Sequence, residues 1–442
     1  MNDTTTRRDL LKRTGVLAMG MLAWPQWMPR VAFAPRDAPT QGDVLICLFM
    51  RGGADGLNLI VPHGDKGYYA ARDQTAIPQP NASNAKAAVD IDGFFGWHPN
   101  LRPLKQVYDA RALAVVHAAG SPDPSKSHFD AMDYMERGTP GEKSMPTGWI
   151  GRHLQNVASN NKSPFRALGM GTILQQSLRG PISATALQSI TDFHLRGDKK
   201  QVDQIQQTLA SLYQGDGFIE REGQQTLQAM QDIAKISQSA YAPANGANYP
   251  ESPFGRALKT IAQLIKGEMG VEVACADIGG WDTHVQQGGA DGNMPRLMDD
   301  FAKSVAAFYA DLQDQMKRIT VVAMTEFGRR VQENASAGTD HGHGGVMFVM
   351  GGGVNGGKVY GEWPGVSKEN LYGPGDLAIT TDFRDVLGEI LQKRLLNANL
   401  SPVFPNYSAF KFRGILQQST AMLDQPPVLT LPFNIKIPLS AG

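Results

Sequence analysis

Five short segments of the chain are almost continuously hydrophobic, as the buried central strands of a sheet are. They are residues 44–50, 112–118, 271–276, 319–324 and 346–350. Amphipathic patterns with helical spacing lie between and around them, near residues 128–137, 149–158, 201–213, 224–237, 254–266, 295–316 and 382–395. Strands that alternate with helices predict an α/β fold, in which helices cover both faces of a doubly wound, mostly parallel sheet.

Two regions break this alternation. The polar, glutamine-rich stretch at about residues 188–247 has an almost entirely helical pattern, which predicts a helical insertion that covers one edge of the sheet. Prolines recur between residues 401 and 442, and they predict an extended tail that wraps the domain. The length fits a single elaborated α/β domain over residues 35–442, and this range contains no repeat of fixed period.

Residues 1–34 have the pattern of an export signal. Arg7 and Arg8 precede a short apolar stretch that ends in Ala-Phe-Ala at Ala34, which is typical of a twin-arginine signal. A membrane-spanning helix is the alternative, but the apolar run is shorter than the roughly 18 residues that a span needs. Pro25 and Pro29 also interrupt it. We therefore expect cleavage after Ala34, a transient partnership with the twin-arginine translocase, and a mature protein in the periplasm or outside the cell, without stable membrane insertion.

Charge and cysteine content narrow the function classes. The 442 residues include 42 Lys plus Arg and 42 Asp plus Glu, so there is no basic excess to indicate nucleic-acid binding. Removal of the signal leaves 37 basic and 40 acidic residues, which makes the mature part mildly acidic. Cys47 and Cys275 lie in apolar runs, and we expect both to be small buried hydrophobic residues.

Polar segments follow several of the predicted strands. In open α/β sheets, ligands bind beyond the carboxyl ends of the strands, so these segments are the first candidates for a site. Asp and His side chains among glycines suit a metal site built from nitrogen and oxygen ligands, whereas a network of solvated loop residues is the alternative. The charged or metal-binding residues of these segments are Arg51, Asp55, Asp277, Asp282, His284, Glu326, Arg329, Asp340, His341 and His343.

A further candidate segment, residues 125–130, lies between the second predicted strand and a helix. The hydroxyl of Ser127 at the helix N-terminus is either a helix cap or a nucleophile whose negative charge the helix stabilises. The chain contains no Gly-x-Ser-x-Gly, His-Glu-x-x-His or Cys-x-x-Cys motif, which disfavours the common serine hydrolases and zinc proteases.

Five motifs follow one another behind the twin-arginine signal: ArgGlyGlyAlaAspGlyLeuAsn, SerHisPheAspAlaMet, GlyTrpAspThrHis, ThrGluPheGlyArgArg and ThrAspHisGlyHisGlyGly. Their succession, over about residues 44–391, resembles the domain-of-unknown-function 1501 family. That family is similar in turn to the alkaline phosphatase and sulfatase superfamily. Its members use two metal ions, held by Asp and His at strand ends, and a Ser, Thr or modified Cys nucleophile to cleave phosphate or sulfate esters.

The resemblance implies an alkaline phosphatase-like fold, one or two divalent metal ions and a small anionic ester as substrate. Zinc is the expected metal, with calcium, magnesium or manganese as alternatives. By order along the chain, the implied metal ligands are Asp55, Asp282, His284, Asp340, His341 and His343. The implied catalytic residues are Ser127 as nucleophile, Arg51 and Arg329 as substrate-binding cations, and Glu326.

The chain also departs from the superfamily pattern. It has no histidine after His343, where the superfamily usually has another ligand, so either His343 supplies that ligand or one metal site is lost. Asp277 competes with Asp282 as the carboxylate ligand, and Ser125 competes with Ser127 as the nucleophile.

Three functions therefore stay open at the level of sequence. The first is an exported metal-dependent hydrolase of phosphate or related anionic esters. The second is a non-catalytic periplasmic binding or assembly protein on the same fold. The third is a sulfatase-like hydrolase, although residues 121–125 do not match the Cys/Ser-x-Pro-x-Arg motif of the usual sulfatases.

Overall fold

The computed structural model describes residues 43–161, 163–190, 199–215 and 241–419, with short stretches within 220–234 and within 428–438. The predicted signal, residues 1–34, lies outside the described residues. Much of the predicted insertion does too, but α7 (Lys199–Leu212) within it is helical, as its pattern predicts. In the described part of the chain, no helix is both long and apolar enough to cross a membrane.

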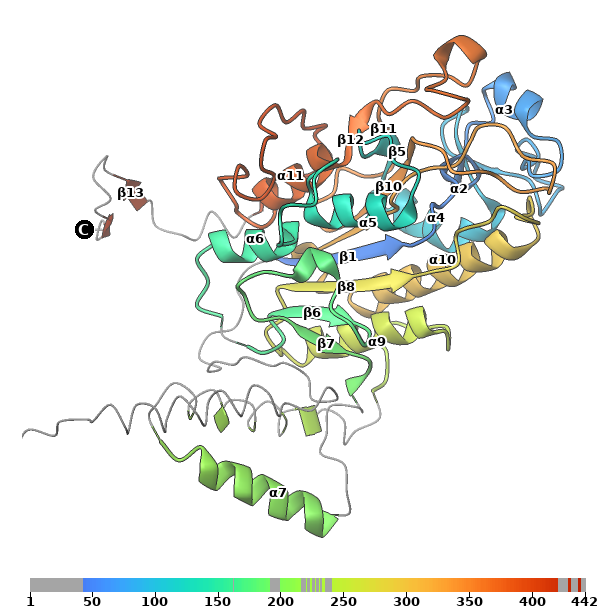
Figure 1. The fold of residues 1–442 in the computed structure, drawn as a ribbon. Helices are drawn as coiled ribbons and strands as arrows, with labels where there is room; N and C mark the ends of the chain where they lie inside the picture. The colour runs from blue at the N-terminus through green and yellow to red at the C-terminus, as the bar shows by residue number, and fades with distance from the viewer. Residues whose placement is uncertain are drawn as a thin grey trace, which may run out of the picture.

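A nine-stranded sheet forms the centre of the fold (Figure 1). Its order is β11-β5-β10-β9-β1-β8-β6-β7, and β12 also pairs with β5. All the pairings are parallel except those of β10, which runs antiparallel to β5 and β9. The strands are β1 (Val44–Met50), β5 (Leu113–Gly120), β6 (Ala167–Met170), β7 (Thr185–Leu187), β8 (Val273–Ile278), β9 (Ile319–Met324), β10 (Gly345–Gly351), β11 (Val359–Tyr360) and β12 (Thr381–Asp382). The predicted mostly parallel α/β sheet is thus confirmed, and all five predicted strands are present.

Side chains of the central strand β1 alternate between two hydrophobic cores, because successive residues of a strand point to opposite faces. Val44, Ile46 and Leu48 belong to one core, whereas Leu45 and Cys47 belong to the other. Every residue of β1 is buried, which explains its continuous hydrophobic run. Cys47 pairs in register with Cys275 on β8, and both are buried free thiols, as expected.

Helices cover both faces of the sheet (Figure 1). The core on one face includes residues of α4 (Arg102–Asp109), α9 (Pro253–Lys266) and α10 (Asn293–Asp311). The core on the other face includes residues of α5 (His128–Arg137), α6 (Trp149–Asn156) and α11 (Phe383–Lys393). The helix predicted at residues 128–137 is α5, with the same bounds. Ser127 caps its start, and Gly138 ends it with a left-handed φ of 69°.

The direction of the strands brings the polar segments to the same end of the sheet. The parallel strands β1, β5, β8 and β9 have their carboxyl ends there, whereas the antiparallel strand β10 begins there. The loop after β1 continues through Asp55 into the short helix α2 (Gly56–Leu59) and the strand β2 (Ile60–Val61). β2 belongs to a small sheet with β3 (Val89–Asp90) and β4 (Gly96–Trp97).

His117 on β5 is a buried neutral imidazole that joins the two sheets. Its Nε2–H donates to the carbonyl of Ile60 over 3.0 Å, and its Nδ1 accepts the N–H of Ala118 over 2.9 Å. A second proton, on Nδ1, would point at this N–H and would be repelled by it, so the geometry favours the neutral ring. Burial lowers the pKa of His117 to about 4.

This pKa predicts a loss of stability in mild acid. The unfolded chain takes up a proton on this histidine near pH 6.5, whereas the folded chain does so near pH 4, so the unfolded state binds more protons between these values. The contribution to stability is complete above pH 6.5 and is lost as the pH falls toward 4. Between pH 7 and pH 5, we expect the free energy of unfolding of the wild type to fall by on the order of 2 kcal/mol more than that of His117→Gln. Urea unfolding measures this, and equal pH dependence of both proteins would contradict it.

Candidate metal centre

Three histidines from three loops meet at one carboxylate. His128 begins α5, His284 follows β8, and His341 precedes β10. Their Nε2 atoms lie 3.3, 3.1 and 3.1 Å, respectively, from Oδ1 of Asp282. Ligand atoms of His128, Asp282 and His341 all lie within 4.8 Å of one another, and Nε2 of His284 is 2.9 Å from Nε2 of His341. We call these four residues the histidine cluster.

The other ring nitrogen of each histidine faces an oxygen that can only accept a hydrogen bond. Each Nδ1 therefore carries the proton and donates it, which leaves the lone pair of the neutral imidazole on Nε2. The pairs are His128 with Oε1 of Glu326 at 2.7 Å, His284 with Oδ1 of Asp340 at 3.0 Å, and His341 with the carbonyl of Lys126 at 2.7 Å.

Three imidazole lone pairs and a carboxylate oxygen thus converge with no histidine proton between them. Nε2 of His128 is buried and makes no hydrogen bond. Such a set of acceptors can hold a cation at its centre, and nitrogen ligands with one carboxylate suit zinc. Carboxylates or carbonyls that hold the outer nitrogen of a histidine are usual around metal ions. The residues therefore fit a divalent metal ion.

The charges of the cluster agree with metal binding. Burial raises the pKa of Asp282, but the hydrogen bond and the positive charge of Arg329 outweigh burial and hold this pKa well below its usual value. Asp282 is therefore ionised. Burial lowers the pKa of His341, which favours the neutral imidazole that a metal requires. The hydrogen bond to Glu326 raises the pKa of His128, so protons compete for this ligand in acid.

Arg329 ties the loops of the centre together. Its buried guanidinium donates to the carbonyls of Gly53 over 2.6 Å, Trp281 over 3.0 Å and Thr339 over 2.8 Å. It also donates to Oδ1 of Asp282 over 2.7 Å. Arg329 is predicted from the sequence resemblance to bind the anionic substrate, but in the structure its guanidinium holds three loops and one ligand in place.

Glycines let these loops approach one another closely. Gly52 has a φ of 121°, and a Cβ there would lie 2.6 Å from the backbone nitrogen of Asp282. A Cβ on Gly338 would lie 2.2 Å from the carbonyl oxygen of His284. In the structure these glycines make room for neighbouring backbone.

Comparison with known proteins places the chain in a family. Residues 112–395 match the family described as "Protein of unknown function (DUF1501)", and this match covers more than half of the chain. The chain belongs to the DUF1501 family. No curated protein matches it.

Three solved structures are distantly similar to this DUF1501 chain. Lipoteichoic acid synthase LtaP from Listeria monocytogenes has 9% identity and a TM-score of 0.35, with 88% of this chain and 80% of that chain covered. The PsFucS1 sulfatase from Pseudoalteromonas sp. has 9% identity and a TM-score of 0.35, with 93% and 78% covered. Alkaline phosphatase from the Antarctic bacterium TAB5 has 9% identity and a TM-score of 0.28, with 72% and 95% covered. Likenesses at this level carry no argument about activity.

The structure places Asp55 outside the histidine cluster. This residue is fully buried and forms a bidentate ion pair with the equally buried Arg72, in which Nη2 lies 3.0 Å from Oδ1. Nε2 of Gln287 donates to its other oxygen over 2.7 Å. The carboxylate that the sequence analysis expected to bind a metal is thus part of a buried polar network in this DUF1501 protein.

Three other candidates also lie elsewhere. Arg51 pairs with Glu136 at 3.2 Å and with Asp277 at 3.0 Å, so these partners already neutralise it, and Asp277 belongs to this ion pair. His343 is buried and stacks on Tyr372 with ring centroids 4.3 Å apart. The structure therefore brings Asp282, His284 and His341 together, but not Asp55, Arg51 or His343. In the described part of the chain, His128, Asp282 and His341 are the one group of three or more potential ligands whose ligand atoms all lie close enough to share an ion.

Glu326, Asp340 and Ser127 surround the cluster. Glu326 and Asp340 accept hydrogen bonds from the rings of ligand histidines and are not ligands themselves. Glu326 also accepts the backbone N–H of Gly52 over 2.8 Å. Ser127 is exposed, and its Oγ accepts the N–H of Asp130 at 3.5 Å, as a helix cap does.

His128 is the site residue that the predicted ligand set omits. Its segment, residues 125–130, is a candidate from the sequence, but the role predicted there belongs to the neighbouring Ser127. The signal that could have identified it was a histidine within a polar segment that follows a predicted strand, as for His284. Nothing in the sequence spacing shows that the first residue of α5 turns its ring toward the loop after β8.

The cluster predicts how single substitutions change metal binding. We expect His128→Ala to lose zinc, because it removes one of three nitrogen ligands. We expect Glu326→Gln to bind zinc about 10–100-fold more weakly, because it weakens the acceptor that orients His128. Metal analysis and titration against a competing chelator measure both effects. His63→Ala, which removes a histidine paired with Asp90 outside the cluster, is the control. Wild-type zinc affinity in His128→Ala would contradict the assignment.

A second prediction separates structural from metal-binding carboxylates. We expect Asp55→Ala to lower the free energy of unfolding by about 3–5 kcal/mol, because Arg72 is left charged and buried. Zinc content of the folded fraction should be unchanged. Asp109→Ala removes an exposed i,i+4 pair with Lys105 and should cost under about 1 kcal/mol. Loss of zinc from Asp55→Ala without loss of stability would make Asp55 a ligand.

Proposed function

We propose that this DUF1501 protein is a metal-dependent hydrolase of phosphate or related anionic esters. The observation that carries the proposal is the convergence of three imidazole lone pairs and one carboxylate at the end of the strands where ligands of α/β sheets bind. A divalent ion bound there would act as a Lewis acid toward an anionic ester. His128, His284, His341 and Asp282 would hold it.

The centre is open on one side, as a catalytic site must be. The side chains of Asp282 and His284 are 47% and 40% exposed. Four protein ligands can complete a zinc site, but zinc can expand to five ligands, so an ion held by these four residues could take a water or substrate oxygen from the exposed side. Access from solvent therefore favours a reactive centre over a purely structural one.

Ser127 is the proposed nucleophile, on the strength of the sequence resemblance and of its place beside a ligand. It directly precedes His128 at the N-terminus of α5, where helix N–H groups and the helix dipole favour an anion. Its cap hydrogen bond is long at 3.5 Å, so its hydroxyl is weakly held. Ser125 stays the alternative, and its Oγ accepts the N–H of Ser127 over 3.3 Å.

Export by the twin-arginine pathway is part of the proposal. The route carries folded proteins, so a metal could be inserted before export. The proposal places the mature enzyme in the periplasm or outside the cell, with a small anionic ester as its substrate.

The proposal is tested with zinc-loaded mature protein and two aryl esters, p-nitrophenyl phosphate and p-nitrophenyl sulfate. We expect phosphate hydrolysis that chelation abolishes and zinc restores. Ser127→Ala should lower kcat at least about 100-fold with zinc still bound, and Ser125→Ala is the matched control. Loss of activity in Ser125→Ala alone would move the nucleophile to that residue.

Two outcomes would replace the proposal. Cleavage of the sulfate ester alone would make the protein a sulfuric ester hydrolase. Zinc binding without turnover of either ester would favour a non-catalytic binding or assembly protein. The second alternative has one observation behind it: Asp55 and His343, the ligands expected for further metal binding, lie outside the cluster.

A further inference from the structure

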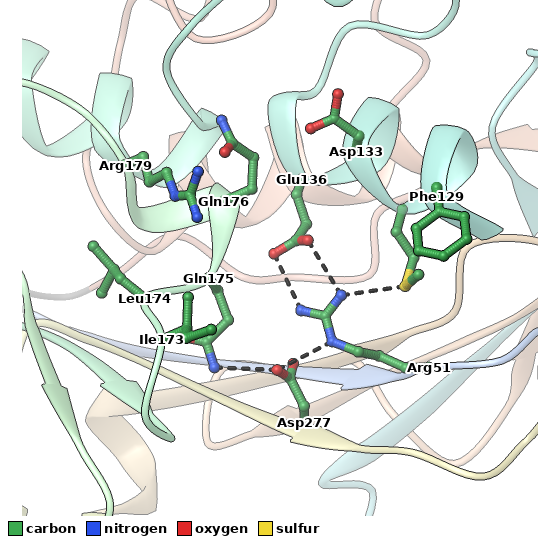
Figure 2. Close-up of a pocket in the computed structure, with 11 residues that line it drawn as sticks. Arg51, Phe129, Asp133, Glu136, Ile173, Leu174, Gln175, Gln176, Arg179 and Asp277 are labelled. Atoms are coloured by element: carbon green, nitrogen blue, oxygen red, sulfur yellow. Dashed lines mark hydrogen bonds and ion pairs between the residues drawn. The ribbon is translucent and has the colours of Figure 1, made fainter.

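A pocket of about 370 Å³ lies against α5, the helix whose first residue is the ligand His128 (Figure 2). Its wall on one side is α5, which contributes Phe129, Met132 and Glu136. Phe129 directly follows the ligand His128, and Arg51 on the floor precedes Gly52, whose N–H holds Glu326. The pocket is therefore built from the same loop and helix that orient the metal ligands. Its volume falls within the range of about 300–1,000 Å³ that ligand pockets have.

Three of the five charged groups that line the pocket are paired with one another. Figure 2 shows Arg51 between Glu136 and Asp277, and the amide of Gln175 donates to Asp277 over 3.2 Å. Asp133 pairs with Arg137 at 2.8 Å. Groups that satisfy one another in this way do not require a charged ligand.

The apolar groups of the pocket, in contrast, face solvent. Phe129 is 84% exposed and Ile173 is 72% exposed, the two highest values among the exposed large hydrophobic residues of the described chain. Burying such side chains against a ligand is favourable by about 25 cal/mol for each Å² of apolar surface removed from water. Exposed apolar side chains that gather in one place mark binding surfaces.

Several exposed apolar residues also neighbour residues of the metal-site loops, in sequence or by contact. The six that the described residues contain are Phe129, Ile173, Ile205, Leu212, Val285 and Tyr372. Phe129 and Val285 follow the ligands His128 and His284 directly, and Tyr372 stacks on His343, two residues after His341. Together with Ile173, four of the six thus lie in the pocket or next to residues of the metal-site loops. The other two lie on α7.

We infer that the pocket binds an apolar group of the ester, of aryl size, while the metal centre holds its anionic group. This inference rests on the proposed function and names the class of substrate: an amphiphilic ester with an apolar organic group rather than a small hydrophilic one. Phe129 and Ile173 determine the specificity by covering that group.

The experiment compares 1-naphthyl phosphate with methyl phosphate as substrates of the zinc-loaded mature protein. We expect wild type to prefer the naphthyl ester, and the ratio of the two kcat/KM values to fall at least about tenfold in Phe129→Ala and in Ile173→Ala. Both side chains are exposed, so the variants should fold and keep zinc. Leu212→Ala, which removes a 66%-exposed side chain from α7, should keep the wild-type ratio. An unchanged ratio in the pocket variants would overturn the inference.

A binding measurement separates this inference from the proposed function. If wild type hydrolyses neither ester, the proposed function fails, and calorimetric titration with uncleavable 1-naphthylphosphonate tests the pocket alone. Weaker binding by about tenfold in Phe129→Ala and Ile173→Ala, but not in Leu212→Ala, would support the pocket. Equal affinity in all proteins, or no binding to wild type, would overturn it.

Discussion

The guanidinium of Arg329 is the interaction on which the metal centre depends. It holds the loop after β1 through Gly53, the loop after β8 through Trp281 and Asp282, and the segment before β10 through Thr339. These loops have little regular structure of their own, and a buried cation surrounded by carbonyl oxygens fixes their spacing. An always-charged, planar group with several donors can do this, whereas an ammonium ion could not span the same acceptors.

A fixed set of loops makes an otherwise unfavourable cluster possible. Three unprotonated imidazole nitrogens and a carboxylate repel one another when nothing positive lies between them. Glu326, Asp340 and the carbonyl of Lys126 hold the rings in this arrangement from outside. Such preorganisation costs stability in the free protein and increases the affinity for a cation, since little reorganisation is left for the binding step.

Much of the fold could be predicted from the sequence, because buried strands and capped helices leave local patterns. β1, β9 and α5 have the predicted bounds, whereas β6 and β7, with four and three residues, are too short to leave a hydrophobic run. The edge of the sheet that carries the site was also predictable from strand direction.

The roles of single residues at that edge were less predictable. Asp55 has the spacing of a ligand, but its partner Arg72 comes from a loop that shows no pattern pointing back to it. Arg329 and Arg51 have the chemistry of anion-binding residues, yet one binds carbonyls and the other pairs with Glu136 and Asp277. Which acceptor a cation meets depends on tertiary contacts, and these have no signature in local sequence. The antiparallel strand β10 also shapes the site. Because it returns beside β9, residues 325–344 form one long hairpin connection with both ends anchored in neighbouring strands. That single connection carries a ligand, two ring-orienting carboxylates and the organising arginine. Because both of its ends are fixed in neighbouring strands, it could be exchanged as one segment without a change in the register of the sheet.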